Sequence, residues 1–159
     1  MAQSLQVDIL SFISCAISNL FVPAAVSTGN EETIRLLLDE GADINGFGGI
    51  FSYPIIAAVE KGKSTAVRIL LDHNAHVNVR GGEDNWPVVS LAAGTLRKDD
   101  LRLILKNVAD INATCSRGTS ALINCADACD PEGLQFLLEN GADVNIVSEK
   151  YGTALHAAA

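Results

Sequence analysis

Short apolar runs recur along the chain, and each is followed by the same kind of polar turn. In chain order the four copies read LLLDEGADIN, ILLDHNAHVN, LILKNVADIN and FLLENGADVN. They end at Asn45, Asn78, Asn112 and Asn145, so the spacings are 33, 34 and 33 residues. Self-similarity at a fixed period of this length indicates stacked structural units, each packing against its neighbours.

Each unit is predicted to contain two short helices. The apolar runs end the second helices, expected near 31–40, 64–73, 98–107 and 131–140. The first helices are expected near 21–28, 54–61, 87–94 and 121–128. Asn30 and Asp130 suit helix N-caps, and Pro54, Pro87 and Pro131 suit the first helical position. Helices this short are unstable alone, so each pair must pack against the next pair to be stable.

Residues 1–19 precede the repeats and are predicted to form a capping helix, with Leu10, Ile13 and Ile17 on one apolar face. No charge occurs between Asp8 and Glu31. A membrane span over 9–26 and a signal or other targeting segment are therefore alternatives. Both would be expected to carry basic residues, and none occurs in this part of the chain.

The remainder divides into units at about 20–45, 46–78, 79–112 and 113–145, followed by a partial unit at 146–159. The partial unit stops within an expected first helix. We interpret the chain as a fragment of a longer repeat array.

Two stretches carry a family resemblance. The sequences TALHAA at 153–158 and GADVN at 141–145 resemble the two signature stretches of the ankyrin repeat. The resemblance covers about residues 20–159. It implies an all-α repeat solenoid of helix-turn-helix pairs joined by β-hairpin loops, whose concave face is made from hairpin tips and first helices.

Several positions depart from the family pattern. The threonine that begins the first helix is replaced by Tyr53 and Trp86, whereas Ser120 and Thr153 keep a hydroxyl. A missing cap costs about 1 kcal/mol. Val108 replaces the glycine that ends the second helix, where a left-handed conformation costs about 1–2 kcal/mol for a β-branched residue. Either Val108 or the preceding Asn107 must adopt it, and the third unit is expected to be the most irregular.

Composition restricts the class of partner. The net charge is −8 and the sequence pI is near 4.7, so nucleic acid and anionic membrane surfaces would be repelled. The four cysteines match no zinc pattern and are interpreted as reduced, mostly buried thiols. We expect a monomer in the cytoplasm or nucleus that binds another protein.

No residues suggest catalysis, a cofactor or a metal. Cys125 is interpreted as a buried structural thiol, with a metal or redox role as the alternative. His156 aligns with a buried histidine of the family. Asp99 and Asp100 are interpreted as the solvated start of a helix.

The resemblance also implies which residues bind a partner. These lie at hairpin tips and on the inner faces of first helices: Gly49, Ile50, Ser52, Glu60, Lys61, Gly82, Glu83, Asn85, Ser116, Arg117, Thr119, Asp127, Glu149 and Lys150. Phe47, Ile50, Phe51, Tyr53 and Trp86 are either contact anchors near two adjacent tips or packing that replaces the missing threonines.

The resemblance implies a non-catalytic protein-interaction module. The alternative is the repeat portion of a larger signalling protein whose catalytic part, of NTPase or ubiquitin-ligase type, lies outside this sequence.

Overall fold

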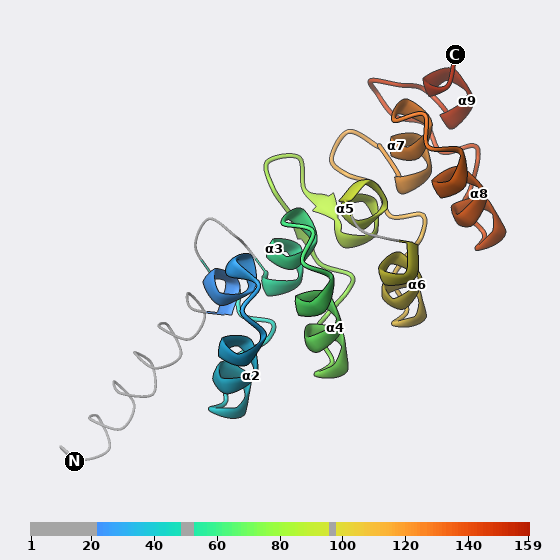
Figure 1. Cartoon of the computed structure of the whole chain (residues 1–159). Coiled ribbons are helices and arrows are strands. Elements are labelled where there is room, and N and C mark those ends of the chain that lie inside the picture. The colour runs from blue at the N-terminus through green and yellow to red at the C-terminus, as the bar shows by residue number, and fades with distance from the viewer. Residues whose placement is uncertain (1–21, 49–52, 96–97) are drawn as a thin grey trace.

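A computed structural model describes residues 22–48, 53–95 and 98–159, and these form a row of stacked helix pairs (Figure 1). The second helices are α2 (Glu31–Asp39), α4 (Ser64–Asp72), α6 (Lys98–Lys106) and α8 (Pro131–Glu139). The first helices are residues 22–28, α3 (Pro54–Glu60), α5 (Val88–Thr95), α7 (Ala121–Asp127) and α9 (Ala154–Ala157). First helices pack on first helices (α3 on α5, α5 on α7 and α7 on α9), and among the second helices α2 packs on α4 and α4 on α6. This arrangement confirms the predicted all-α repeat solenoid.

Local capping chemistry explains where several helices begin. The side chain of Asn30 accepts a hydrogen bond from Thr33 N, and that of Asp130 accepts one from Gly133 N at 3.0 Å. Ser120 caps α7, whereas Tyr53 makes no side-chain cap on α3. The loss of the helix cap that was predicted from the missing threonine is therefore confirmed at Tyr53.

Hairpin loops connect the units and project from one end of the helix pairs (Figure 1). In one of them, β1 (Arg80–Gly81) pairs antiparallel with β2 (Trp86–Pro87). The next two loops close through single bridges, Thr114 with Ser120 and Ser148 with Gly152. The prediction that Pro87 begins a helix is wrong, because this proline belongs to β2 and α5 starts one residue later.

The core runs along the stack between the two layers of helices. Its largest fully buried side chains include Ile34, Ile56, Leu70, Ile104 and Leu137, each from a different helix. Burying each such side chain contributes roughly 1.5–3 kcal/mol. Every unit therefore depends on apolar contacts with the units beside it.

The third unit departs from the others where α6 ends. Val108 has a φ of 65°, whereas the equivalent Gly41 and Gly141 have φ values of 86° and 89°. Val108 itself adopts the left-handed conformation, so the alternative assignment to Asn107 is wrong. The Val108 side chain is 81% exposed, so no apolar burial offsets the backbone strain.

The N-terminal predictions lie mostly outside the described residues. The capping helix of 1–19 falls entirely there, as does most of the alternative membrane span over 9–26. Within the described part of the chain, each helix is too short or too polar to cross a bilayer.

Candidate functional site

Successive hairpins are joined by backbone and side-chain bonds. Ser116 N donates to Asp84 O at 2.8 Å, and Arg117 Nε lies 3.1 Å from the Asp84 carboxylate. Glu149 N then donates to Arg117 O at 3.0 Å, and the Arg80 guanidinium donates to Thr114 O. These links hold the tips of three consecutive loops in a fixed row.

A second set of links lies at the opposite ends of the loops, at the repeat-defining asparagines. Asn45 Oδ1 accepts a hydrogen bond from His76 N at 2.8 Å, and Asn78 Oδ1 accepts one from Asp110 N at 2.9 Å. Asn112 Oδ1 accepts one from Asp143 N at 2.8 Å. The recurring asparagine therefore joins each unit to the main chain of the next, and this explains the pattern that set the period.

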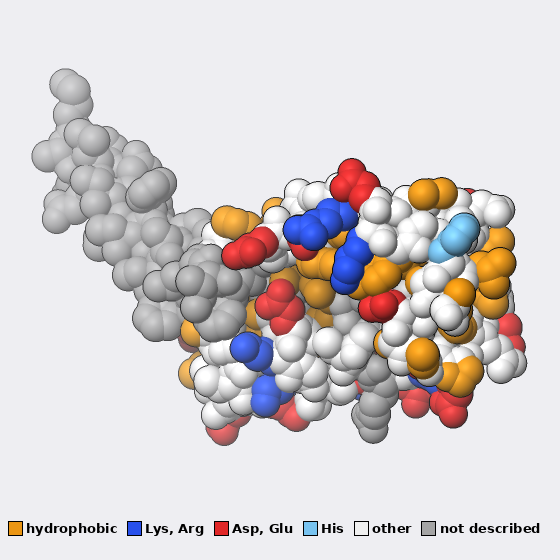
Figure 2. Space-filling view, turned by 90° about the horizontal axis from the view of Figure 1, so that it is seen from above, with side chains coloured by type: hydrophobic (Ala, Val, Ile, Leu, Met, Phe, Trp, Pro, Cys, Tyr) orange, Lys and Arg blue, Asp and Glu red, His pale blue; other side chains and the backbone are white. Residues whose placement is uncertain are grey.

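Most of the predicted partner-binding residues that fall within the described ranges are exposed. They are Glu60, Lys61, Gly82, Glu83, Asn85, Ser116, Arg117, Asp127, Glu149 and Lys150. Gly49, Ile50 and Ser52 lie outside the described residues. Seen from the side on which the hairpins project, Lys, Arg, Asp and Glu side chains surround an exposed hydrophobic area (Figure 2).

Thr119 is a correction to the predicted surface. Its side chain is buried, and its Oγ1 lies 2.7 Å from Ser148 Oγ of the following loop. In the hairpin before it, Gly82 and Asn85 have positive φ, and Asn85 is at the same register position as Thr119. In the hairpin that contains Thr119, the positive φ of 75° belongs to Gly118, one position earlier. The two turns are built differently, so the equivalent side chains point in different directions.

The aromatic residues near the first tips pack within their own loops. The rings of Phe47 and Tyr53 meet edge to face with centroids 5.3 Å apart, although Phe47 remains exposed. Trp86 is half-buried beside Gly82. Tyr53 thus packs against its own loop.

Sequence reasoning missed one aromatic contact at the last tip. Lys150 Nζ lies 2.6 Å from the Tyr151 hydroxyl and 4.3 Å from the ring centroid. The hydrogen bond to Tyr151, together with the electrostatic attraction of that residue's phenolate form, raises the pKa of Lys150. A lysine directly before a tyrosine at a tip position was the available signal.

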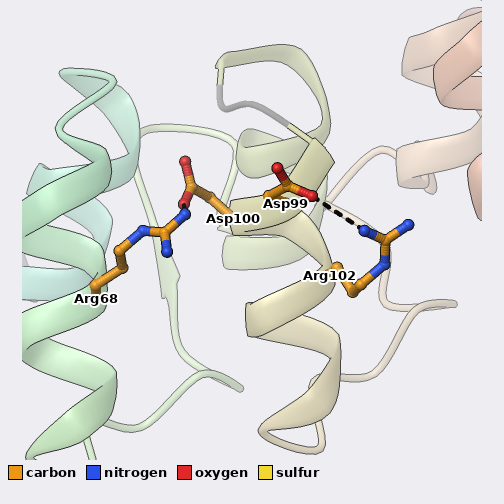
Figure 3. A network of polar contacts seen from close by, with 4 residues as sticks. All are labelled: Arg68, Asp99, Asp100 and Arg102. Atoms are coloured by element: carbon orange, nitrogen blue, oxygen red, sulfur yellow. Dashed lines mark hydrogen bonds and ion pairs between the residues drawn. The ribbon is translucent and has the colours of Figure 1, made fainter.

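Asp100 is a second correction, because it is fully buried instead of solvated. Its Oδ1 lies 2.6 Å from Arg68 Nη2, which joins the second helices of adjacent units (Figure 3). Its neighbour Asp99 is exposed as predicted and pairs with Arg102 on the same helix at 3.0 Å. Arg68 comes 32 residues earlier in the chain, so no local pattern indicated the pair.

Comparison with known families agrees with this geometry. A family model described as ankyrin repeats (3 copies) matches residues 22–115, more than half of the chain. The chain belongs to the ankyrin repeat family. Ankyrin repeats are generally protein–protein interaction modules. The pair α7 and α8 and the helix α9 continue the same ankyrin architecture beyond the matched range.

The three cysteines within the described ranges, Cys115, Cys125 and Cys129, are free thiols. Cys125 is buried on α7, and burial together with the charge of Asp130 raises its pKa to about 11, although Lys98 partly opposes this. The thiol is therefore protonated and a poor nucleophile at neutral pH. Cys129 is exposed beyond the end of α7 with a φ of 52°.

The ankyrin histidine at 156 was expected to be buried, and this is wrong. His156 is exposed, and its Nδ1 lies 2.8 Å from Thr153 Oγ1 and accepts a hydrogen bond from Thr153 N. It therefore caps α9. Among the described residues, His, Cys, Asp and Glu side chains form no group of three or more that could hold a metal ion.

Proposed function

We propose that this ankyrin chain is a non-catalytic module that binds another protein through its hairpin tips and concave face. One observation carries the proposal: exposed charged side chains project from loops that are joined to one another by hydrogen bonds. Because Arg117 O and Asp84 O accept hydrogen bonds from the next loop, the tips need little ordering on binding. A preorganised surface lowers the entropic cost of association.

The chemistry of this surface favours a partner of mixed charge. Acidic positions (Glu60, Glu83, Asp127 and Glu149) are interspersed with basic ones (Lys61, Arg117 and Lys150) along the row. Such a mixture of charges suits specific pairing with another protein better than binding to a uniformly charged polymer. The net charge of −8 adds a further argument against nucleic acid.

The state of the thiols bears on location. Cys115, Cys125 and Cys129 are free, and two of them are buried. Reduced thiols suit a reducing compartment, so we propose a cytoplasmic or nuclear location. We also propose that the protein is monomeric and acts as a scaffold.

The test uses charge reversal at the tips. We expect Glu83→Lys and Lys150→Glu each to weaken capture of a partner identified by pull-down and mass spectrometry, by roughly tenfold when combined. Arg35→Glu, on an exposed position of α2, is the matched control and should leave capture unchanged. Far-ultraviolet circular dichroism confirms that each variant is folded.

Arg117 is a poor choice for this experiment, because its ion pair with Asp84 joins two hairpins. Substitution there would change the shape of the surface as well as its charge. Undiminished capture by the Glu83→Lys, Lys150→Glu double variant would show that the partner binds elsewhere.

A further inference from the structure

A groove lies beside the second helices α6 and α8, in the layer of the stack away from the hairpin tips (Figure 1). α2 packs on α4 and α4 on α6, whereas α6 and α8 approach each other less closely. The groove between α6 and α8 has a volume of about 350 Å³ and is lined by Arg102, Leu105, Lys106, Ala109, Ile111 and Asn140. Two of these side chains are cations and three are apolar.

The charges beside this groove differ from those at the same positions of the other units. Lys106 is the last residue of α6, whereas the last residues of α2, α4 and α8 are acidic: Asp39, Asp72 and Glu139. Four residues earlier, the first three units each carry an arginine: Arg35, Arg68 and Arg102. The first two units therefore place a cation one turn before an anion, and the third unit places two cations there.

The carboxylate that pairs with Arg68 across two units has no counterpart for Arg102. Arg68 of α4 pairs with the buried Asp100 of α6, and the residue of α8 at the position of Asp100 is Gly133. Figure 3 shows Arg102 on the other side of α6, pointing away from α4. Its guanidinium carbon lies 5.2 Å from the centre of the Phe136 ring of α8. This cation–π contact holds the guanidinium beside the groove.

Both cations keep donors for an anionic group. Arg102 Nη1 lies 3.0 Å from Asp99 Oδ1 in an exposed pair, and a guanidinium has five N–H donors. Lys106 is exposed, and the ion pairs of the described residues do not include it. Glu139 of α8 accepts a hydrogen bond from Gln135 of its own helix at 2.8 Å. A carboxylate arriving from another molecule would therefore meet two cations without breaking a buried contact.

A pocket of similar size between the second and third units shows what distinguishes the α6–α8 groove. Its volume is about 340 Å³, and its lining consists of Asn74, Ala75, His76, Val77, Asn78 and Asn107. Three of these residues are equivalent to Ala109, Ile111 and Asn140. Neither Arg68 nor Asp72 is part of that lining. The two hollows are alike in size and differ in charge, and the α6–α8 groove has the chemistry to bind an anion.

We infer that the α6–α8 groove is a second docking surface, which takes an acidic segment of a partner protein. A carboxylate of the segment binds between Arg102 and Lys106, and an apolar neighbour covers Leu105, Ala109 and Ile111. Charge complementarity selects this occupant. A free inorganic anion would leave the apolar residues uncovered, and the net charge of −8 repels a densely anionic polymer. The inference does not depend on the function proposed above, because it concerns a different surface.

The experiment titrates the isotopically labelled full chain with the acetylated and amidated peptide EELEE and with its uncharged match QQLQQ. Such a short ligand is expected to bind weakly, so each peptide is added to about 5 mM while amide shifts are followed by NMR. We expect EELEE to shift the amides from Arg102 to Ile111 and that of Asn140. QQLQQ should leave these amides unchanged.

Substitutions locate the binding surface. Lys106→Asp introduces the acidic residue of the other units and should weaken EELEE binding about tenfold or more, because an anion replaces a cation. Arg35→Glu makes the same change in net charge at the position of Arg102 in the first unit, and should leave binding unchanged. The Glu83→Lys, Lys150→Glu double variant should also bind EELEE normally, which separates this surface from the hairpin tips.

Shifts that persist in Lys106→Asp, or the absence of localised shifts at the highest EELEE concentration, would overturn the inference. Equal weakening by Lys106→Asp and Arg35→Glu would also overturn it, since overall charge alone would then explain the binding. Inorganic phosphate is titrated in parallel. Phosphate shifts equal to those of EELEE at the same concentration would assign the groove to a free anion and exclude a protein segment as its specific occupant.

Discussion

The third and fourth units solve the same folding problem with different means. In the fourth, Ser120 caps α7, Asp130 caps α8, and Gly141 follows the end of α8 with a φ of 89°. In the third, α5 follows directly on a β-strand, and Val108 follows the end of α6 with a strained φ of 65°. The helix ends of the fourth unit are thus stabilised by residues of that unit, whereas the third unit carries a strained residue where its second helix ends.

The third unit is supported by its neighbour instead. Arg68 of α4 pairs with the buried carboxylate of Asp100, and Asn78 Nδ2 donates to the carbonyl of the strained Val108 at 2.9 Å. Both contacts come from the second unit. Weak local signals are thus offset by contacts between units, as expected where stability is shared along a row of repeats.

The largest expected loss of stability comes from a substitution at Gly118 in the fourth unit. A Cβ at Gly118 would lie 2.7 Å from Val147 O, and the residue has a φ of 75°. Gly118→Ala should therefore cost about 2–4 kcal/mol in the free energy of unfolding, from strain and overpacking together. Urea denaturation measures it.

Gly141→Ala is the matched control within the same unit. Its φ is also positive, but no atom lies within 4 Å of the added Cβ. Strain alone should cost about 1–2 kcal/mol. Equal losses in the two variants would mean that the close approach between the two hairpins does not contribute.

The second effect removes the support that the third unit receives. Arg68→Met should cost about 1.5–3 kcal/mol, because the fully buried Asp100 loses a charge-assisted hydrogen bond. Arg102→Met is the comparison, since Arg102 and Asp99 form an exposed pair worth about 0–1 kcal/mol. Chemical denaturation of both variants checks the order, and a larger loss for Arg102→Met would contradict it.

A smaller effect should repair the third unit. Val108→Gly should stabilise the protein by about 1 kcal/mol, since glycine tolerates the left-handed conformation and an exposed side chain is lost. Val147→Gly, at another exposed valine, should instead cost about 0.5–1 kcal/mol. Thermal unfolding of the two variants should move the midpoint in opposite directions.

The last prediction concerns the reactivity of Cys125 and Cys129, the two thiols of the fourth unit, and involves the smallest change in stability at neutral pH. At pH 8, iodoacetamide should modify Cys129 in the folded protein and leave Cys125 intact, as peptide mass mapping can check. Because the pKa of Cys125 is raised on folding, its contribution to the free energy of unfolding is fully present below the ordinary thiol pKa of 9.0. That contribution is lost as the pH rises through about 11. Rapid modification of Cys125 at pH 8 would contradict its burial.

Much of the fold followed from the sequence because its signals are local. Asn30, Pro54 and Asp130 lie at or beside the first residue of a helix, and the predicted second helices differ from the observed ones by a residue at one end. The candidate site could be predicted less well from the sequence, because the direction of its side chains depends on contacts between units. Thr119 meets Ser148 29 residues later, and Asp100 meets Arg68 32 residues earlier.

The asparagine links have an evolutionary consequence. Each carboxamide contacts a main-chain N–H, and the residues supplying it are His76, Asp110 and Asp143. A main-chain donor is the same whatever side chain it carries. Units could thus be duplicated or exchanged by recombination without the co-evolution of matching side chains at this joint, leaving the exposed loops free to diversify.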